Sequence, residues 1–76
     1  MKLEIAYYYK QNNATIHHGK IKNGKDFYKV EYENEKGNLI SIDINEKTFK
    51  ELLPFLELEL EDDWEEDKLF IYIFKS

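Results

Sequence analysis

The chain has 76 residues, of which 42% are hydrophobic and 36% are charged, and its formal net charge is -5. This length accommodates one domain, 1–76, because small domains bury only about 60% of the surface that their unfolded chains expose. The chain contains no cysteine, which excludes disulfide bonds, a thiolate nucleophile and zinc sites of the cysteine-rich kind.

The sequence predicts a cytosolic protein, in a bacterium or in a host cell. No stretch approaches the roughly 18 apolar residues that a membrane helix needs. The first residues include Glu4, where a signal peptide would be apolar.

The two halves of the chain differ in charge. Residues 1–38 carry +2, whereas residues 39–76 carry -7. All eleven cations are lysines, so the chain lacks the planar guanidinium fork that reads guanine edges and binds phosphates in a bidentate way. Sequence-specific binding to nucleic acid is therefore not expected.

Residues 3–9 predict a first strand, because apolar residues recur at the odd positions with period two. A weaker strand is expected over 15–22, interrupted at Gly19. It should end in a hairpin turn at Asn23-Gly24, a strong short-range turn signal.

The next two strands show the clearest alternation of apolar and polar residues. Tyr28, Val30 and Tyr32 alternate with charged residues, and the isoleucines of 40–44 alternate with Ser41 and Asp43. The turn between these strands is predicted at 35–38.

At Asn45 the apolar period changes to that of a helix, and Asn45 can cap its first turn. A helix over 46–53 is expected to end before Pro54, which lacks a backbone N–H. Residues 56–61 alternate leucine with glutamate, which predicts an edge strand with one apolar and one acidic face; continued helix is the alternative, since both residue types favour helices.

The last elements are a loop and a strand. Residues 62–67 predict a loop, or one helical turn capped by Asp63. Residues 69–74 are apolar at every position, which predicts the most buried, central strand. The expected fold is α+β: one domain with a mostly antiparallel sheet of five to six strands and one short helix, in the order β-β-β-β-α-β-β.

No motif predicts catalysis, a metal site or a cofactor. His17 and His18 are adjacent, so in a strand their side chains point to opposite faces and would meet at one metal ion only if Gly19 breaks the strand there. The three glycines are spaced for turns, and no hydroxyl lies in a nucleophile frame. We therefore expect a protein that is not an enzyme and binds no metal or cofactor.

The acidic run is the most distinctive feature of the sequence, because acids fill eight of the eleven positions from 57 to 67. One interpretation is a solvated face that keeps the protein soluble and protects an edge strand. The other is a docking surface for a basic partner, with the tryptophan as an apolar anchor among carboxylates that steer encounter. The candidate partner-binding residues are Glu57, Glu59, Glu61, Asp62, Asp63, Trp64, Glu65, Glu66 and Asp67.

Twelve aromatic residues exceed what one small core needs and indicate a second candidate interface. A sheet covered by one short helix would leave an aromatic patch on its other face, unless the sheet closes into a small barrel. The residues assigned to this patch are Tyr8, Phe70, Tyr72 and Phe74.

These observations favour a small acidic protein-binding module. Its predicted role is to inhibit or modulate a basic partner, such as a nucleic-acid-handling enzyme, as phage or mobile-element proteins do. The alternatives are a structural homodimer that pairs through the aromatic sheet face, and an immunity or antitoxin-like protein with the same electrostatics. Direct binding to nucleic acid through the lysines near Tyr28 is disfavoured by the acids that follow.

Overall fold

The computed structural model describes residues 2–21, 24–63 and 67–75. They form an α+β domain with a five-stranded antiparallel sheet, which confirms the predicted fold class. The elements are, in chain order, α1 (Lys2–Gln11), β1 (Thr15–Ile21), β2 (Phe27–Glu33), β3 (Leu39–Ile44), α2 (Glu46–Leu52), a 3-10 turn η1 (Leu53–Phe55), β4 (Leu56–Asp63) and β5 (Asp67–Phe74).

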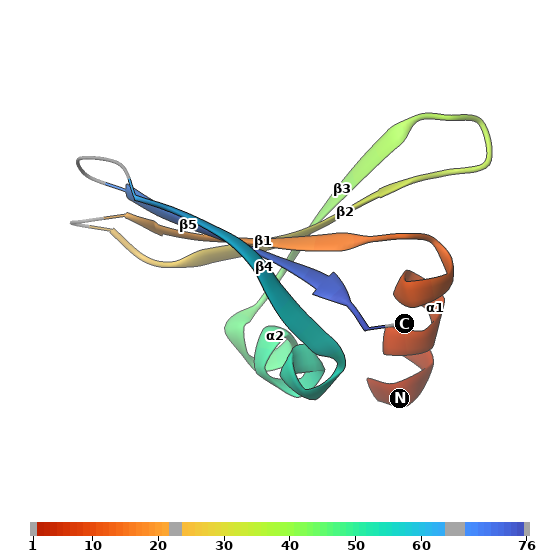
Figure 1. Cartoon of the computed structure of the whole chain (residues 1–76), viewed down its shortest axis with the longest axis horizontal. Coiled ribbons are helices and arrows are strands. Elements are labelled where there is room, and N and C mark those ends of the chain that lie inside the picture. The colour runs from red at the N-terminus through yellow and green to blue at the C-terminus, as the bar shows by residue number, and fades with distance from the viewer. Residues whose placement is uncertain (1, 22–23, 64–66, 76) are drawn as a thin grey trace.

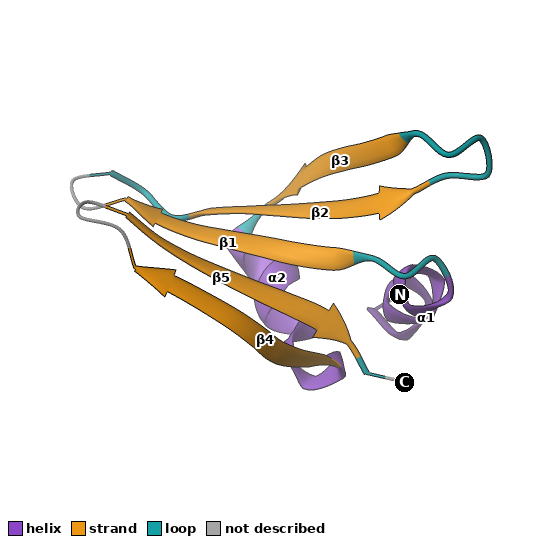
Figure 2. Cartoon of the chain, turned by 45° about the horizontal axis from the view of Figure 1, so that its top comes forward, coloured by secondary structure: helices purple, strands orange, loops and turns teal. Residues whose placement is uncertain are grey.

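The strands lie in the order β3-β2-β1-β5-β4, and each neighbouring pair is antiparallel. β5 therefore lies inside the sheet, as predicted, although β1 takes the central position. Figure 1 shows a strongly twisted sheet with both helices on one side, and Figure 2 shows the strand order directly. Among the described residues, no helix is long and apolar enough to cross a membrane.

The first element is a helix, so the predicted strand over 3–9 is wrong. Apolar residues fill every position from 5 to 9 and therefore fit a helical period as well as an alternating one. In the folded chain Ala6 is buried, and Tyr9, three residues on, packs against the core. Tertiary packing thus overrides the strand propensity of the tyrosines.

Local chemistry also fixes the end of α1. Asn13 adopts a left-handed conformation with φ of 52°. The N–H of Ala14 bonds to the carbonyl of Tyr9 at 3.0 Å, and the N–H of Asn13 bonds to that of Lys10 at 3.3 Å. This is the Schellman arrangement, which gives partners to carbonyls of the last turn.

The two predicted hairpins are present. β1 pairs with β2, although Asn23 of the predicted Asn23-Gly24 turn lies outside the described residues. Between β2 and β3, Asn34 Oδ1 accepts hydrogen bonds from the N–H groups of Lys36 and Asn38, both at 2.9 Å. Gly37 has φ of +82°, a conformation that favours glycine in this turn.

The prediction for α2 is confirmed. Asn45 Oδ1 accepts a hydrogen bond from the N–H of Thr48 at 2.7 Å and caps the helix. The helix ends at Leu52, and Pro54 lies in the 3-10 turn that leads into β4. β4 is an edge strand, as expected, and the alternative of continued helix is wrong.

One irregularity interrupts β4. Leu58 lies opposite Tyr72, whereas Leu60 lies opposite Ile71, so a bulge at Glu59 shifts the register by one residue. Positions before and after the bulge are therefore out of phase. The predicted strict division of 56–61 into one apolar and one acidic face does not hold.

The core lies between the sheet and the two helices. Its buried residues are Ala6, Ala14, Ile16, Tyr28, Val30, Phe49, Leu52, Leu56 and Phe74. Because strand residues alternate between faces, β1 and β5 present Thr15, His17, Leu69, Ile71 and Ile73 to the opposite face, which neither helix covers. We call this the open face.

Candidate functional site: an acidic sheet edge

The first part of the predicted acidic segment lies along the free edge of β4. Glu57, Leu58 and Glu59 are all exposed, and the Leu58 side chain retains 52% of its accessible surface. Leu56, immediately before them, is buried and anchors the strand. We call residues 57–59 the acidic edge. Neither of its carboxylates forms an ion pair with another described side chain, so both charges face solvent.

The remaining acidic positions are placed only in part. Glu61, Asp62 and Asp63 continue β4 opposite Phe70, Leu69 and Lys68, and Asp67 begins β5 opposite Ile21. The prediction of a loop over 62–67 is therefore wrong at both ends, because Asp62 and Asp63 belong to β4 and Asp67 belongs to β5. Trp64, Glu65 and Glu66 lie outside the described residues.

The two histidines lie on opposite faces of β1, as predicted from their adjacency. On the open face, His17 Nε2 is 2.8 Å from Glu31 Oε1 and 3.3 Å from the Thr15 hydroxyl. Lys29 Nζ lies 3.9 Å from the other carboxylate oxygen of Glu31. A catalytic triad engages both imidazole nitrogens, one by the nucleophile and one by the carboxylate. Here both oxygens meet the same nitrogen, so the group links strands and does not form a relay.

His18 is part of the core packing. Its ring stacks on Tyr28, with centroids 4.4 Å apart, and lies 5.3 Å from Phe49 and 5.2 Å from Phe70. Its Nε2 lies 3.3 Å from Asp26 Oδ2, while its Nδ1 is buried and has no hydrogen-bond partner among the described residues. No group of three or more metal-ligating side chains occurs in the described part of the chain.

Three tyrosines, Tyr8, Tyr9 and Tyr28, have raised pKa values, and the causes are burial, neighbouring charges and a hydrogen bond. Burial raises the pKa of Tyr28 above its ordinary value of 10.0, and the Glu46 and Asp26 carboxylates raise it further. Burial likewise raises the pKa of Tyr9. For Tyr8 the main cause of a raised pKa is its hydrogen bond with Tyr32. These tyrosines therefore stay protonated and neutral well into the alkaline range.

The aromatic residues predicted to line a free sheet face do not do so. Phe70, Tyr72 and Phe74 lie on the face that carries the helices, where Phe74 is buried and Tyr72 meets the Phe49 ring edge-on at 5.2 Å. Tyr8 is on α1 and contacts Tyr32. The open face is instead aliphatic along β5, and the described sheet is an open one with β3 and β4 at its two edges.

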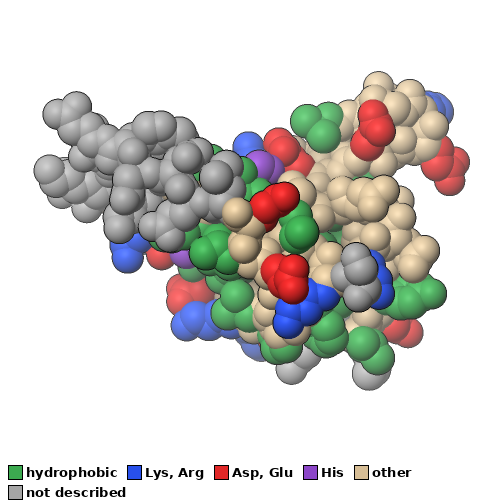
Figure 3. Space-filling view, in the orientation of Figure 1, with side chains coloured by type: hydrophobic (Ala, Val, Ile, Leu, Met, Phe, Trp, Pro, Cys, Tyr) green, Lys and Arg blue, Asp and Glu red, His purple; other side chains and the backbone are tan. Residues whose placement is uncertain are grey.

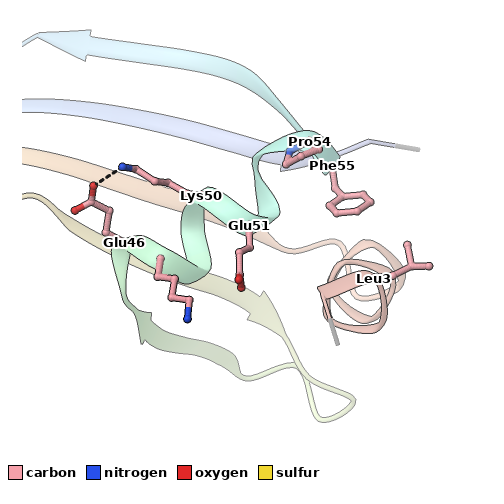
Figure 4. Close-up of a pocket in the computed structure, with 7 residues that line it drawn as sticks. Leu3, Glu46, Lys50, Glu51, Pro54 and Phe55 are labelled. Atoms are coloured by element: carbon pink, nitrogen blue, oxygen red, sulfur yellow. Dashed lines mark ion pairs between the residues drawn. The ribbon is translucent and has the colours of Figure 1, made fainter.

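The sequence did not indicate a groove between the helices. Leu3 of α1 and Phe55 of η1 both line it, while Glu46 and Lys50, which also line it, form an ion pair of 2.9 Å (Figure 4). The groove is shallow and open to solvent. It was not foreseeable because it depends on residues 2–11 being helical.

Exposed apolar side chains lie next to acidic and basic ones on the face shown in Figure 3. Comparison with known protein families, curated proteins and solved structures finds no match to this chain.

Proposed function

We propose that this protein is a small acidic, non-enzymatic binding module that docks on a basic protein surface through its acidic edge. The observation that carries the proposal is the exposure of Glu57 and Glu59 on either side of an exposed Leu58, along the edge of β4 that faces away from β5 and pairs with no described strand. A free edge combines charge, an apolar contact and unpaired backbone groups in one place.

The backbone of the acidic edge is suited to an added strand. The N–H of Lys75 bonds to the carbonyl of Phe55 at 2.9 Å. Hydrogen-bonded and non-hydrogen-bonded pairs alternate in an antiparallel ladder, so the N–H and C=O of Leu58 point away from β5. An extended basic segment could bond to Leu58 and place its cations beside Glu57 and Glu59.

Charge supports the same class of partner. The net charge of -5 comes from the half of the chain that contains β4, so the field steers basic surfaces toward this edge. Rim charges speed association more than they add affinity, and an apolar anchor supplies residence time. We assign that role to Leu58 and, from the sequence, to Trp64. Replacing Trp64 by Ala is expected to cost on the order of 2 kcal/mol in binding, mostly as faster dissociation.

Enzymes and toxins that act on nucleic acids carry the basic surfaces that such an edge would fit, because they must neutralise phosphates. We therefore propose that the module inhibits or modulates a partner of this kind, in the manner of small phage, mobile-element or immunity proteins. Pairing through an aromatic sheet face receives no support, because those aromatic residues lie on the side of the helices.

An NMR titration tests the docking mode. The probe is a synthetic peptide that alternates lysine and valine, and its control alternates glutamate and valine. The proposal predicts that the lysine peptide shifts the amide signals of residues 56–59 most, and that the glutamate peptide leaves them unchanged. Shifts that spread evenly over all exposed acids, or that centre on another element, would show that the acidic edge is not a docking site.

A further inference from the structure

The two edges of the sheet differ in chemistry. β4 carries Glu57 and Glu59 at exposed positions, and their charges discourage pairing with a second strand of the same kind. β3 has the sequence LISIDI, with one charged residue and no proline, and five of its six side chains are apolar or uncharged polar. Leu39 retains 68% of its accessible surface and Ile42 retains 40%. Figure 2 shows β3 along the margin of the sheet with no described segment beyond it.

The backbone groups that β3 offers to a partner follow from its hairpin. The N–H of Asn34 bonds to the carbonyl of Asn38 at 2.9 Å, which makes these two residues a hydrogen-bonded pair. Alternation along the ladder then places Ile40 and Ile42 in hydrogen-bonded pairs with β2. The N–H and C=O groups of Leu39, Ser41 and Asp43 consequently point outward from the edge.

The strand complements a copy of itself. In an antiparallel pair centred on Ile42, Ile42 lies opposite its own copy and Ile40 lies opposite Ile44. Ser41 then lies opposite Asp43, and its hydroxyl can donate to the carboxylate. Every outward backbone group from Ser41 to Asp43 gains a partner, and the two aspartates do not face each other.

We propose that β3 is a self-association edge, through which two copies of this chain pair about a two-fold axis at Ile42 to form one continuous ten-stranded sheet. Such a contact is isologous and closes on itself, so assembly stops at the dimer. A pair of six-residue strands buries a small area, so dimerisation is weak and depends on concentration. The inference is independent of the proposed function, because it uses the opposite edge and leaves both acidic edges free.

Other pairings are disfavoured by the same chemistry. Two β4 edges would bring Glu57 and Glu59 close to their own copies, and like charges on facing strands repel. Pairing β3 of one copy with β4 of the next would not close, and would build filaments of growing mass. A pair centred on Ser41 would also avoid facing aspartates, but it would place Leu39 opposite Asp43.

Cysteine cross-linking tests the register directly, because the chain has no cysteine of its own. The two copies of Ile42 would form a non-hydrogen-bonded pair across the interface, because the backbone groups of Ile42 bond to β2. Facing residues of such a pair have Cα atoms about 4.5 Å apart, a separation that a disulfide spans. Ile42→Cys is therefore expected to form a disulfide-linked dimer under mild oxidation. Ser41→Cys is the register control, because the two copies of residue 41 would lie on a diagonal about 7–8 Å apart. Leu58→Cys is the matched exposed position on the other edge.

The proposal predicts that Ile42→Cys cross-links about tenfold faster than either control, because pairing raises the local thiol concentration. Sedimentation of the unmodified chain should show a monomer–dimer equilibrium that Ile42→Lys abolishes and Leu58→Lys leaves intact. The proposal is overturned if Ser41→Cys or Leu58→Cys links as fast as Ile42→Cys, if none of the three links, or if mass grows beyond the dimer. Circular dichroism of each variant confirms that it is folded before it is compared.

Discussion

His18 provides the sharpest test of whether the adjacent histidines are structural or form a site. Its ring contacts Tyr28, Phe49 and Phe70, while its Nδ1 is buried without a hydrogen-bond partner in the part of the chain that the structure describes. A phenylalanine at this position would keep the ring contacts and remove the unpartnered nitrogen. We therefore expect His18→Phe to stabilise the fold and His18→Ala to destabilise it.

The magnitudes follow from these contacts. A buried polar group without a partner costs about 1–3 kcal/mol, and removing it recovers that amount. Against this stands the loss of the 3.3 Å contact with Asp26, a long and partly exposed interaction worth about 0.5 kcal/mol. His18→Phe is therefore expected to raise the free energy of unfolding by about 1 kcal/mol. His18→Ala loses the aromatic contacts, each worth about 0.5–1.5 kcal/mol, and should cost about 2 kcal/mol.

Thermal and urea unfolding followed by circular dichroism measure both variants. A change of 1 kcal/mol shifts the Tm of a domain this size by about 4–8 °C. His17→Phe on the open face is the control, because it removes the 2.8 Å contact with Glu31 and should not raise Tm. If His18→Phe destabilises the protein as much as His18→Ala does, the aromatic packing is not the reason for a ring at this position.

Three further predictions concern the cap, the tyrosines and the histidine pair. Asn45→Ala removes the hydrogen bond to the N–H of Thr48 and should lower the free energy of unfolding by about 1 kcal/mol in urea titrations, whereas Asn45→Ser should retain most of it. Burial raises the pKa of Tyr28 above 10.0, so as pH rises the Tyr28 hydroxyl loses its proton in the unfolded chain before it does so in the folded chain. The free energy of unfolding is therefore unaffected by Tyr28 ionisation below about pH 10 and falls as pH rises further. Tyr28→Phe should therefore make stability fall less steeply between pH 10 and 12 in alkaline unfolding experiments, and an unchanged slope would contradict the assignment. Calorimetry with Zn²⁺ and Ni²⁺ should detect no specific binding; micromolar affinity that disappears in the double variant His17→Ala, His18→Ala would refute this.

The parts of the fold that the sequence predicted are those fixed by local chemistry. Asn45 sets the start of α2 by a side-chain cap, and Pro54 sets its end because it lacks a backbone N–H. Both effects act within a few residues. The alternation in β2 and β3 and the glycine turn between them are likewise local. The opposite orientation of His17 and His18 follows from strand geometry alone.

The parts that the sequence did not predict depend on contacts between distant segments. Residues 5–9 fit both a helix and a strand, and only packing against Tyr32 and Phe74 selects the helix. The missed signal was Asn13, which readily adopts the left-handed conformation that ends α1. The bulge at Glu59 has no glycine or proline to mark it, and the choice of which face of β5 meets the helices is made by α1 and α2.

The candidate site shows the same division. The solvent exposure of Glu57 and Glu59 could be predicted from charge, and the edge position of β4 from its alternation with leucine. That Leu58 is open to solvent could not be predicted, because it depends on how far α2 and η1 extend over the sheet. The self-association edge at β3 needed the strand order, which one sequence does not contain.

The most direct test of the acidic edge is the association rate of the lysine–valine peptide with two matched double variants, measured at low and high salt. Glu57→Gln, Glu59→Gln removes the charges of the acidic edge, and Glu33→Gln, Glu35→Gln removes two exposed charges at the β2–β3 hairpin; either change takes the net charge from -5 to -3. If the acidic edge is the docking site, the first variant slows association several-fold at low salt and little at high salt, while the second has a much smaller effect. Equal slowing by both variants would mean that only net charge attracts the peptide, and would contradict a docking site at β4.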